Sequence, residues 1–149
     1  MKEAYGGIVS LVFIAIFLVI VISILGLVVS YTKAFKMKDR IISVIEEYEG
    51  SGCYPELSGG SSASACRERI KDAARELGYS PANLNCGGSL TKSSDNLYCY
   101  SMDRLTDSNK AVFKVVTQVD ISFPIIDKIM GFRFFQVAGD TQTVELQLD

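Results

Sequence analysis

The sequence predicts an α+β protein in which a long amino-terminal transmembrane-plus-stalk helix carries a small disulfide-bonded head with an antiparallel sheet. Three observations predict this fold class: an uncharged apolar run at residues 8–29, four cysteines within residues 53–99, and a regular alternation of apolar and polar residues over 112–123. The chain has 149 residues, of which 48% are hydrophobic and 21% charged, so it is long enough for one compact domain and too apolar for disorder.

The apolar run from Ile8 to Val29 is long enough to cross a lipid bilayer. Its 22 residues would extend about 33 Å as a helix, which matches the hydrocarbon thickness of a membrane. A secretory signal peptide has a shorter apolar core and a cleavage site of small residues, and residues 30–40 offer no such site. We therefore expect a retained membrane helix. Cleavage near Gly6 or Gly7 by a prepilin-type peptidase stays open, because it would leave the run intact.

Two signals disagree about which side of the membrane holds the rest of the chain. Four basic residues follow the apolar run within residues 33–40, whereas only Lys2 precedes it, and the positive-inside rule would then place the head in the cytoplasm. An even number of cysteines in a small domain is instead typical of disulfides in an oxidising compartment. Because we give the cysteines more weight, we expect a single-pass cell-membrane protein with its carboxy-terminal domain outside the cytoplasm.

The cysteines are best explained as two disulfides. Their spacing is 13, 20 and 13 positions, with no C-x-x-C pair that would suggest a zinc ligand set or a redox dithiol: Cys53, Cys66, Cys86 and Cys99. Of the three possible pairings, Cys53–Cys66 with Cys86–Cys99 is preferred because each bond closes a short local loop. Four unpaired buried thiols remain the alternative.

We expect one continuous rod from Ile8 to Glu49, followed by a head at residues 50–149. Residues 31–49 contain neither proline nor glycine, and apolar residues recur there at helical spacing, flanked by Ile41 and Tyr48: Tyr31, Phe35, Ile42 and Ile45. Of these, Phe35, Ile42 and Ile45 should be buried against the head sheet.

In the head, a Gly- and Ser-rich linker at 50–64 should lead into a second helix with Ser64 as its N-cap and Gly78 as its C-cap. Ser80-Pro81 should open a further helical turn, and a loop from Gly87 to Asn96 should precede a short strand at 97–102. The core-facing residues expected on the second helix are Cys66, Ile70, Ala73 and Leu77.

The clearest strand is residues 112–123. Its odd-numbered residues form one apolar face, and its even-numbered residues, apart from Val116, include the polar Lys114, Gln118, Asp120 and Ser122. A helical turn should follow at 125–131. The last segment, 132–148, also reads as extended, but its apolar residues change parity, which predicts a bulge or break near Gly139-Asp140.

The residues offer little chemistry. The chain has no histidine, which excludes His-dependent triads and most catalytic zinc sites. Three further sets of residues are interpreted as surface or core. A Ser–Lys dyad could be drawn from Ser89, Lys92 and Ser93, and a calcium loop from Asp103, Asp107 and Asn109, but both sets are better explained as solvated surface residues. A tyrosine platform could be drawn from Tyr48, Tyr54, Tyr79, Tyr98 and Tyr100, but these residues are more simply part of the core of the head. We expect no catalytic residue, no metal, no cofactor and no small-molecule substrate. The net charge of −2 argues against direct nucleic-acid binding.

The layout resembles that of the tight-adherence (TadE/TadF-like) pseudopilins and related pilin-like components of Gram-positive conjugation or secretion systems. The resemblance rests on the membrane helix and on the carboxy-terminal pattern of Val115–Pro124 followed by Gly139–Leu148. It implies a structural subunit, major or minor, of a cell-envelope filament, secretion or DNA-transfer apparatus. Gly6-Gly7 are present, but Ser10 and Leu11 stand where such subunits carry a glutamate.

Two functions follow as expectations. In the first, the chain packs with copies of itself or other pilin-like subunits through small residues at helical spacing in the span: Ser23, Gly26 and Ser30. In the second, it is a monomeric membrane-anchored module that recognises a ligand or receptor. Tyr98, Tyr100 and the Cys86–Cys99 loop would then be the contact surface.

Overall fold

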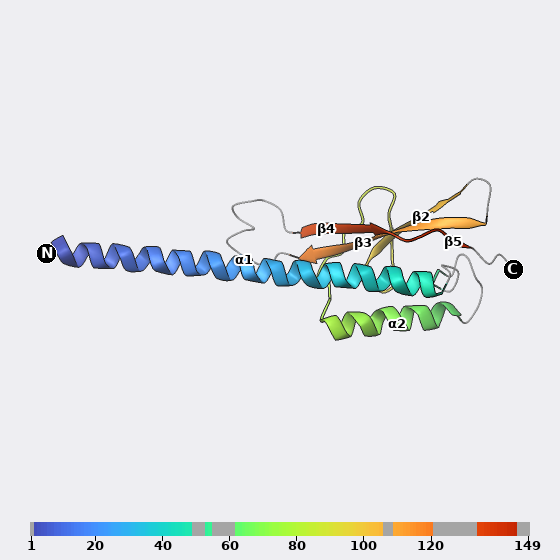
Figure 1. Cartoon of the computed structure of the whole chain (residues 1–149), viewed down its shortest axis with the longest axis horizontal. Coiled ribbons are helices and arrows are strands. Elements are labelled where there is room, and N and C mark those ends of the chain that lie inside the picture. Colours follow the sequence, from blue (N-terminus) through green and yellow to red (C-terminus); the bar gives the residue numbers. More distant parts are fainter. Residues whose placement is uncertain (1, 49–52, 55–61, 106–108, 121–133, 146–149) are drawn as a thin grey trace.

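The computed structural model confirms an α+β fold with a long amino-terminal helix and a small head that contains an antiparallel sheet and two disulfides (Figure 1). It describes residues 2–48, 53–54, 62–105, 109–120 and 134–145. The elements in chain order are α1 (Lys2–Glu47), α2 (Ser62–Leu77), β1 (Thr91–Lys92), β2 (Cys99–Arg104), β3 (Lys110–Asp120), β4 (Phe134–Asp140) and β5 (Val144–Glu145).

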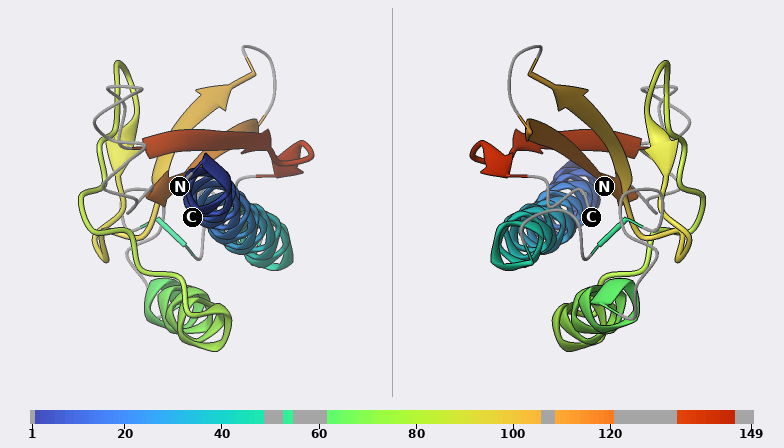
Figure 2. Two further views of the ribbon diagram at one scale, coloured as in Figure 1. Left: turned by 90° about the vertical axis from the view of Figure 1, so that its left-hand side faces the viewer. Right: turned by 90° about the vertical axis from the view of Figure 1, so that its right-hand side faces the viewer.

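Helix α1 is unbroken over 46 residues and belongs to two environments. Its amino-terminal half extends beyond the head, whereas its carboxy-terminal half lies between the sheet and α2 (Figures 1 and 2). The side chains that face the head core are fully or almost fully buried: Ala34, Met37, Ile41, Val44 and Ile45. The stalk is therefore a structural layer of the head.

The buried face of the stalk differs from the one expected. Ile45 is fully buried as predicted, but Phe35 is 42% exposed and Ile42 is only partly buried. The sheet approaches α1 so closely that the Thr117 hydroxyl donates a hydrogen bond to the Ala34 carbonyl at 3.0 Å. A small side chain fits at that contact, and Phe35 instead stacks on Tyr31 on the exposed side, with ring centroids 6.4 Å apart.

The sheet is antiparallel in the order β1-β2-β3-β4, with β5 also paired to β3. As predicted, the odd-numbered residues of β3 from 113 to 119 are buried on the face towards α1: Phe113, Val115, Thr117 and Val119. Gln118 corrects the expected polar face, since it is only 2% exposed. Its amide nitrogen donates to the Asn83 carbonyl and its amide oxygen accepts from the Asn85 N–H, which fastens residues 83–85 over the sheet.

The predicted break in the last strand lies directly after Asp140. Lys114 pairs with Asp140 and Ala111 with Val144, so two residues of β3 lie opposite the three residues that connect β4 to β5. This one-residue excess is a β-bulge, and it changes which parity faces the core. Thr141 bridges the interruption, because its N–H donates to the Phe113 carbonyl and its hydroxyl accepts from the Phe113 N–H.

Three local expectations were wrong and one was right. Helix α2 begins at Ser62, which places Ser64 inside its first turn. Residues 80–86 are irregular, with a bend at residues 82–83 and no helical turn. The expected 87–96 loop contains β1, and the next strand begins only at Cys99. Gly78 does end α2, with φ of 59° and hydrogen bonds from its own N–H to Arg75 and from the Tyr79 N–H to Ala74. The turn expected at 125–131, the strand residues Ile121 and Phe123, and Glu49 lie outside the described residues.

Candidate functional site

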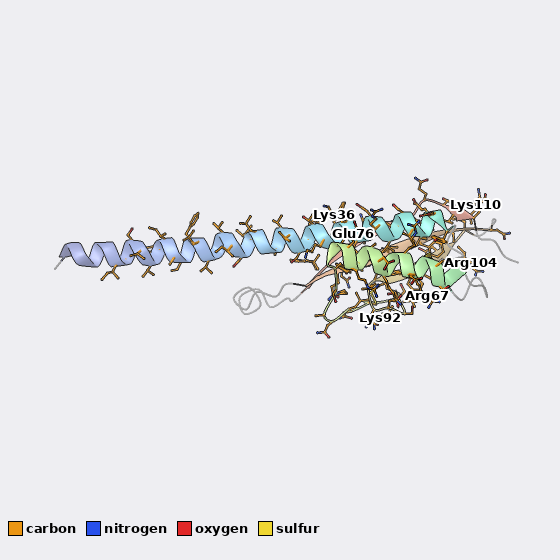
Figure 3. All side chains as sticks on the ribbon, turned by 90° about the horizontal axis from the view of Figure 1, so that it is seen from below. Lys36, Arg67, Glu76, Lys92, Arg104 and Lys110 are labelled. Carbon is orange, nitrogen blue, oxygen red and sulfur yellow. A yellow bond between two sulfur atoms is a disulfide. The ribbon has the colours of Figure 1, made fainter. Side chains whose placement is uncertain are left out.

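The amino-terminal half of α1 is an exposed apolar surface. Its most apolar stretch has no residue buried within the chain, and α1 is the one helix in the described part of the chain that is long and apolar enough to cross a membrane. Phe13, for example, is 68% exposed. The charged side chains labelled in Figure 3 all lie on the head half of the molecule. An apolar surface of this size needs a lipid or protein partner.

The small residues of α1 continue the line of its buried face. Ser30 lies four positions before Ala34 and seven before Met37, so these residues share one side of the helix. Ser30 also borders a hollow beside Gly78 at the end of α2. The Ser23 hydroxyl donates to the carbonyl four residues before it, which satisfies it within the helix.

The two disulfides join Cys53 to Cys66 and Cys86 to Cys99, each across 13 positions. This is the local pairing preferred from the spacing. Cys53, Cys66 and Cys99 are buried, which gives these bonds a structural role. The first ties the segment after α1 to α2, and the second ties the loop before β1 to the first residue of β2. Two disulfides in a small head are typical of an oxidising, extracytoplasmic compartment.

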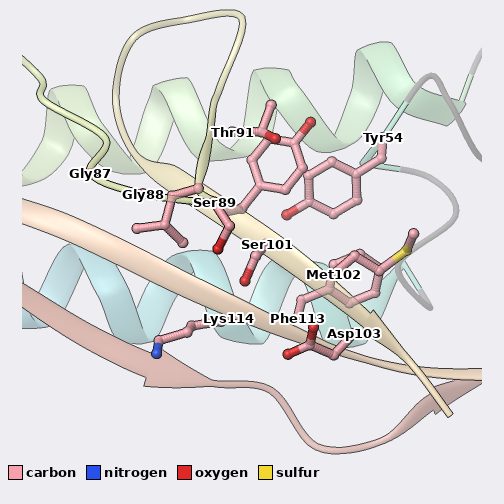
Figure 4. Close-up of a pocket in the computed structure, with 12 residues that line it drawn as sticks. Tyr54, Gly87, Gly88, Ser89, Thr91, Ser101, Met102, Asp103, Phe113 and Lys114 are labelled. Atoms are coloured by element: carbon pink, nitrogen blue, oxygen red, sulfur yellow. The ribbon is translucent and has the colours of Figure 1, made fainter.

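A cavity of about 650 Å³ lies beside this second disulfide. We call it the β2 slot, because residues 87–91 form one wall and residues 100–103 of β2 form the other (Figure 4). Residues from both faces of the sheet border it, so the slot straddles an edge of the sheet. Its other lining residues are Tyr54, Phe113 and Lys114.

Two of the five tyrosines named from the sequence, Tyr54 and Tyr100, line the slot, and Tyr98 lies next to Tyr100. Tyr54 lies between Phe113 and Tyr100, with ring centroids 4.9 Å and 4.3 Å away, and Tyr98 lies 6.1 Å from Tyr100. The buried Tyr54 hydroxyl makes no hydrogen bond of good geometry with any described residue, and its polar neighbour is the Tyr98 hydroxyl. Burial raises the pKa of Tyr54, and it raises the pKa of Tyr98 to about 12.

Burial of Tyr98 predicts a loss of stability in alkali. The fold favours the neutral phenol, so this contribution is complete below pH 10 and is lost as pH rises from the ordinary pKa of 10 through the folded pKa of about 12. Circular dichroism and tyrosinate absorbance across this range should show unfolding coupled to ionisation. In Tyr98→Phe the stability should depend less strongly on pH in this range, and the dependence that remains should come from the buried Tyr54. Superimposable curves for the variant and the parent chain would contradict this.

The remaining candidate residues are separated. Tyr79 bonds through its hydroxyl to the backbone of Gln118, and Tyr48 packs at the end of α1. The Ser93 hydroxyl accepts hydrogen bonds from the backbone N–H groups of Leu97 and Tyr98, so it shapes a turn. Asp107 lies outside the described residues. Nowhere in the described ranges do three or more potential metal ligands gather.

The sequence predicts a contact surface at Tyr98, Tyr100 and the Cys86–Cys99 loop, but it does not predict the slot itself. The slot exists because β1 pairs with β2 over only two residues, and residues 87–90 then separate from β2. No local sequence pattern indicates where this separation begins. The Gly87-Gly88 pair was the one available signal. Comparison with protein families, with curated proteins and with solved structures finds no match to this chain.

Proposed function

We propose that this chain is a pilin-like structural subunit of a cell-envelope filament, secretion or DNA-transfer apparatus. It would be held in the membrane by α1, with its head outside the cytoplasm and its neighbours being copies of itself or other pilin-like subunits. The observation that carries the proposal is the continuity of α1 from an exposed apolar half into the buried core of the head.

This continuity gives the head a fixed direction. Ala34, Met37 and Ile41 are fully buried in the head, and no linker separates them from the apolar half of the same helix. A head built this way cannot swivel on its anchor. Rigid coupling suits a subunit whose apolar helices pack side by side while the heads form an outer layer. The disulfides support the extracytoplasmic placement of the head.

The β2 slot favours a second candidate function, a monomeric membrane-anchored binding module. In that case the apolar half of α1 would contact lipid alone, and gentle extraction would yield monodisperse monomers. The two functions therefore differ in whether α1 has protein neighbours within the membrane.

Gly26→Ile tests the proposed function. Small residues let apolar helices approach closely, and close packing replaces the hydrophobic effect as the attraction between helices in lipid. We expect cross-linking between subunits and the yield of filaments seen by electron microscopy after gentle extraction to fall about tenfold or more. The added bulk lies on the helix side shared by Ser30 and Met37.

Val28→Phe is the matched control. It also adds four carbon atoms, but Val28 lies about 200° away around the helix and is exposed. This variant should assemble like the parent chain. Equal assembly of Gly26→Ile and Val28→Phe would show that the small residues are not the interface. Monomers from the parent chain itself would favour the binding module.

A further inference from the structure

Beyond its two paired residues, the β1–β2 hairpin opens, and the segment before β1 separates from β2. Its pairing consists of Thr91 with Tyr100 and Lys92 with Cys99, although β2 continues to Arg104. Residues 87–90, which would extend β1 along β2, instead form the far wall of the β2 slot. The part of β2 from Ser101 to Arg104 therefore has no neighbouring strand on this side among the described residues.

Backbone groups of β2 point into this opening. The Leu105 N–H donates to the Lys110 carbonyl at 3.0 Å across β2 and β3. Because bonding direction alternates along a strand, odd-numbered residues of β2 bond to β3, and Met102 and Arg104 direct their N–H and C=O groups to the open edge. The Ser93 N–H donates to the Tyr98 carbonyl, which agrees with this parity.

Elsewhere in the fold, backbone groups without a neighbouring strand bond to a side chain. Gln118 of β3 lies beyond the start of β2, so β2 does not reach its backbone. The Tyr79 hydroxyl donates to the Gln118 carbonyl and accepts from the Gln118 N–H, both at 3.0 Å. No described side chain makes the equivalent bonds to Met102 or Arg104. The open edge of β2 is thus left available for a further strand.

The two faces of the β2 slot differ in chemistry. On the face towards α1 lie the aromatic and apolar side chains of Tyr54, Tyr100 and Met102. Figure 4 shows these side chains beside residues 87–91 of the opposite wall.

The opposite face is polar and charged. It carries Ser101, Asp103 and Lys114, and neither charged group forms an ion pair with a described residue. Side chains of an extended segment alternate between the two faces of a sheet. A strand in the slot would therefore present apolar side chains to one face and charged or hydroxyl side chains to the other.

We propose that the open edge of β2 binds an extended peptide segment of a partner protein, which adds a strand to the sheet. The segment alternates apolar side chains, facing Tyr54 and Met102, with charged or hydroxyl side chains that complement Asp103 and Lys114. The four open residues of β2 correspond to about 13 Å of strand. Strand addition obtains affinity from main-chain hydrogen bonds and specificity from alternate side chains. This role is independent of whether α1 assembles in the membrane.

The test uses the full chain in detergent and end-blocked synthetic hexapeptides in which Val, Leu or Phe alternates with Ser, Lys or Glu. Each peptide is paired with an isomer of the same composition whose apolar residues are grouped together. We expect alternating peptides to bind more tightly than their isomers, and N-methylation of the backbone amides to weaken the best binder about tenfold or more. Equal binding of the isomers, or no effect of N-methylation, would overturn the proposal.

Met102→Pro provides the test on the protein side, because it removes an N–H that faces the slot and spares the bonds to β3. Ala138→Pro is the matched control on the outer edge of β4, where the same parity directs the N–H away from β3. We expect about tenfold weaker peptide binding for Met102→Pro alone, with circular dichroism confirming the fold. Unchanged binding in folded Met102→Pro would overturn the proposal. Pairing of the open edge of β2 only with a second copy of the chain would also overturn the proposal. If Met102→Pro does not fold, the N-methylated peptides decide.

Discussion

Phe113→Ala should lower the free energy of unfolding by about 3–5 kcal/mol, the range for removing a fully buried aromatic side chain. Phe113 has no exposed surface, lies on the face of β3 that covers α1, and stacks on Tyr54. Its loss would leave a cavity between the sheet, the stalk and the segment fixed by Cys53–Cys66. Urea unfolding of the full chain in detergent, with both disulfides oxidised and circular dichroism as the signal, measures the effect.

Phe135→Ala is the matched control for this prediction. It is the same chemical change on the neighbouring strand β4, but Phe135 is 42% exposed. It should cost clearly less, on the order of 1 kcal/mol. Equal losses for the two variants would mean that Phe113 is not the centre of the core.

Ile41→Ala should cost about 2–5 kcal/mol. Ile41 is fully buried on α1, and α1 packs against both the sheet and α2, so its truncation leaves a cavity in the core that these elements share. Ile42→Ala changes the adjacent residue, which is only partly buried, and should cost less than half as much. The two variants therefore report which side of the stalk the head covers. A larger loss for Ile42→Ala would restore the face expected from the sequence.

The stalk, β3 and the disulfide pairing could be predicted because each depends on a local pattern. A long uncharged run, a two-residue alternation and two cysteine intervals of 13 positions are visible without knowledge of distant contacts. Which side of the stalk faces the head could not be predicted in this way. It depends on how closely the sheet approaches, as shown by Gly139, where an added Cβ would lie 2.8 Å from Lys38 Cδ and 2.9 Å from Ile42 Cδ1.

The candidate site was only partly predictable for the same reason. Cysteine spacing located the Cys86–Cys99 loop, and the adjacent tyrosines indicated a surface there. The opening beside β2 depends on where two chains diverge, which is a tertiary property. Burial of Gln118 likewise follows from the segment at 83–85 that lies over it, and its polar side chain alone predicted an exposed position.

The bond between Thr117 and Ala34 spans 83 positions, and it has a consequence for the order in which the chain folds. The stalk is synthesised early, but the strand that covers its inner side comes much later. Until residues 110–120 have been synthesised, Met37 and Ile41 have no sheet to cover them. The two disulfides close local loops and need no such wait. Disulfide formation can therefore precede packing, and the core of the head closes only after β3 is present.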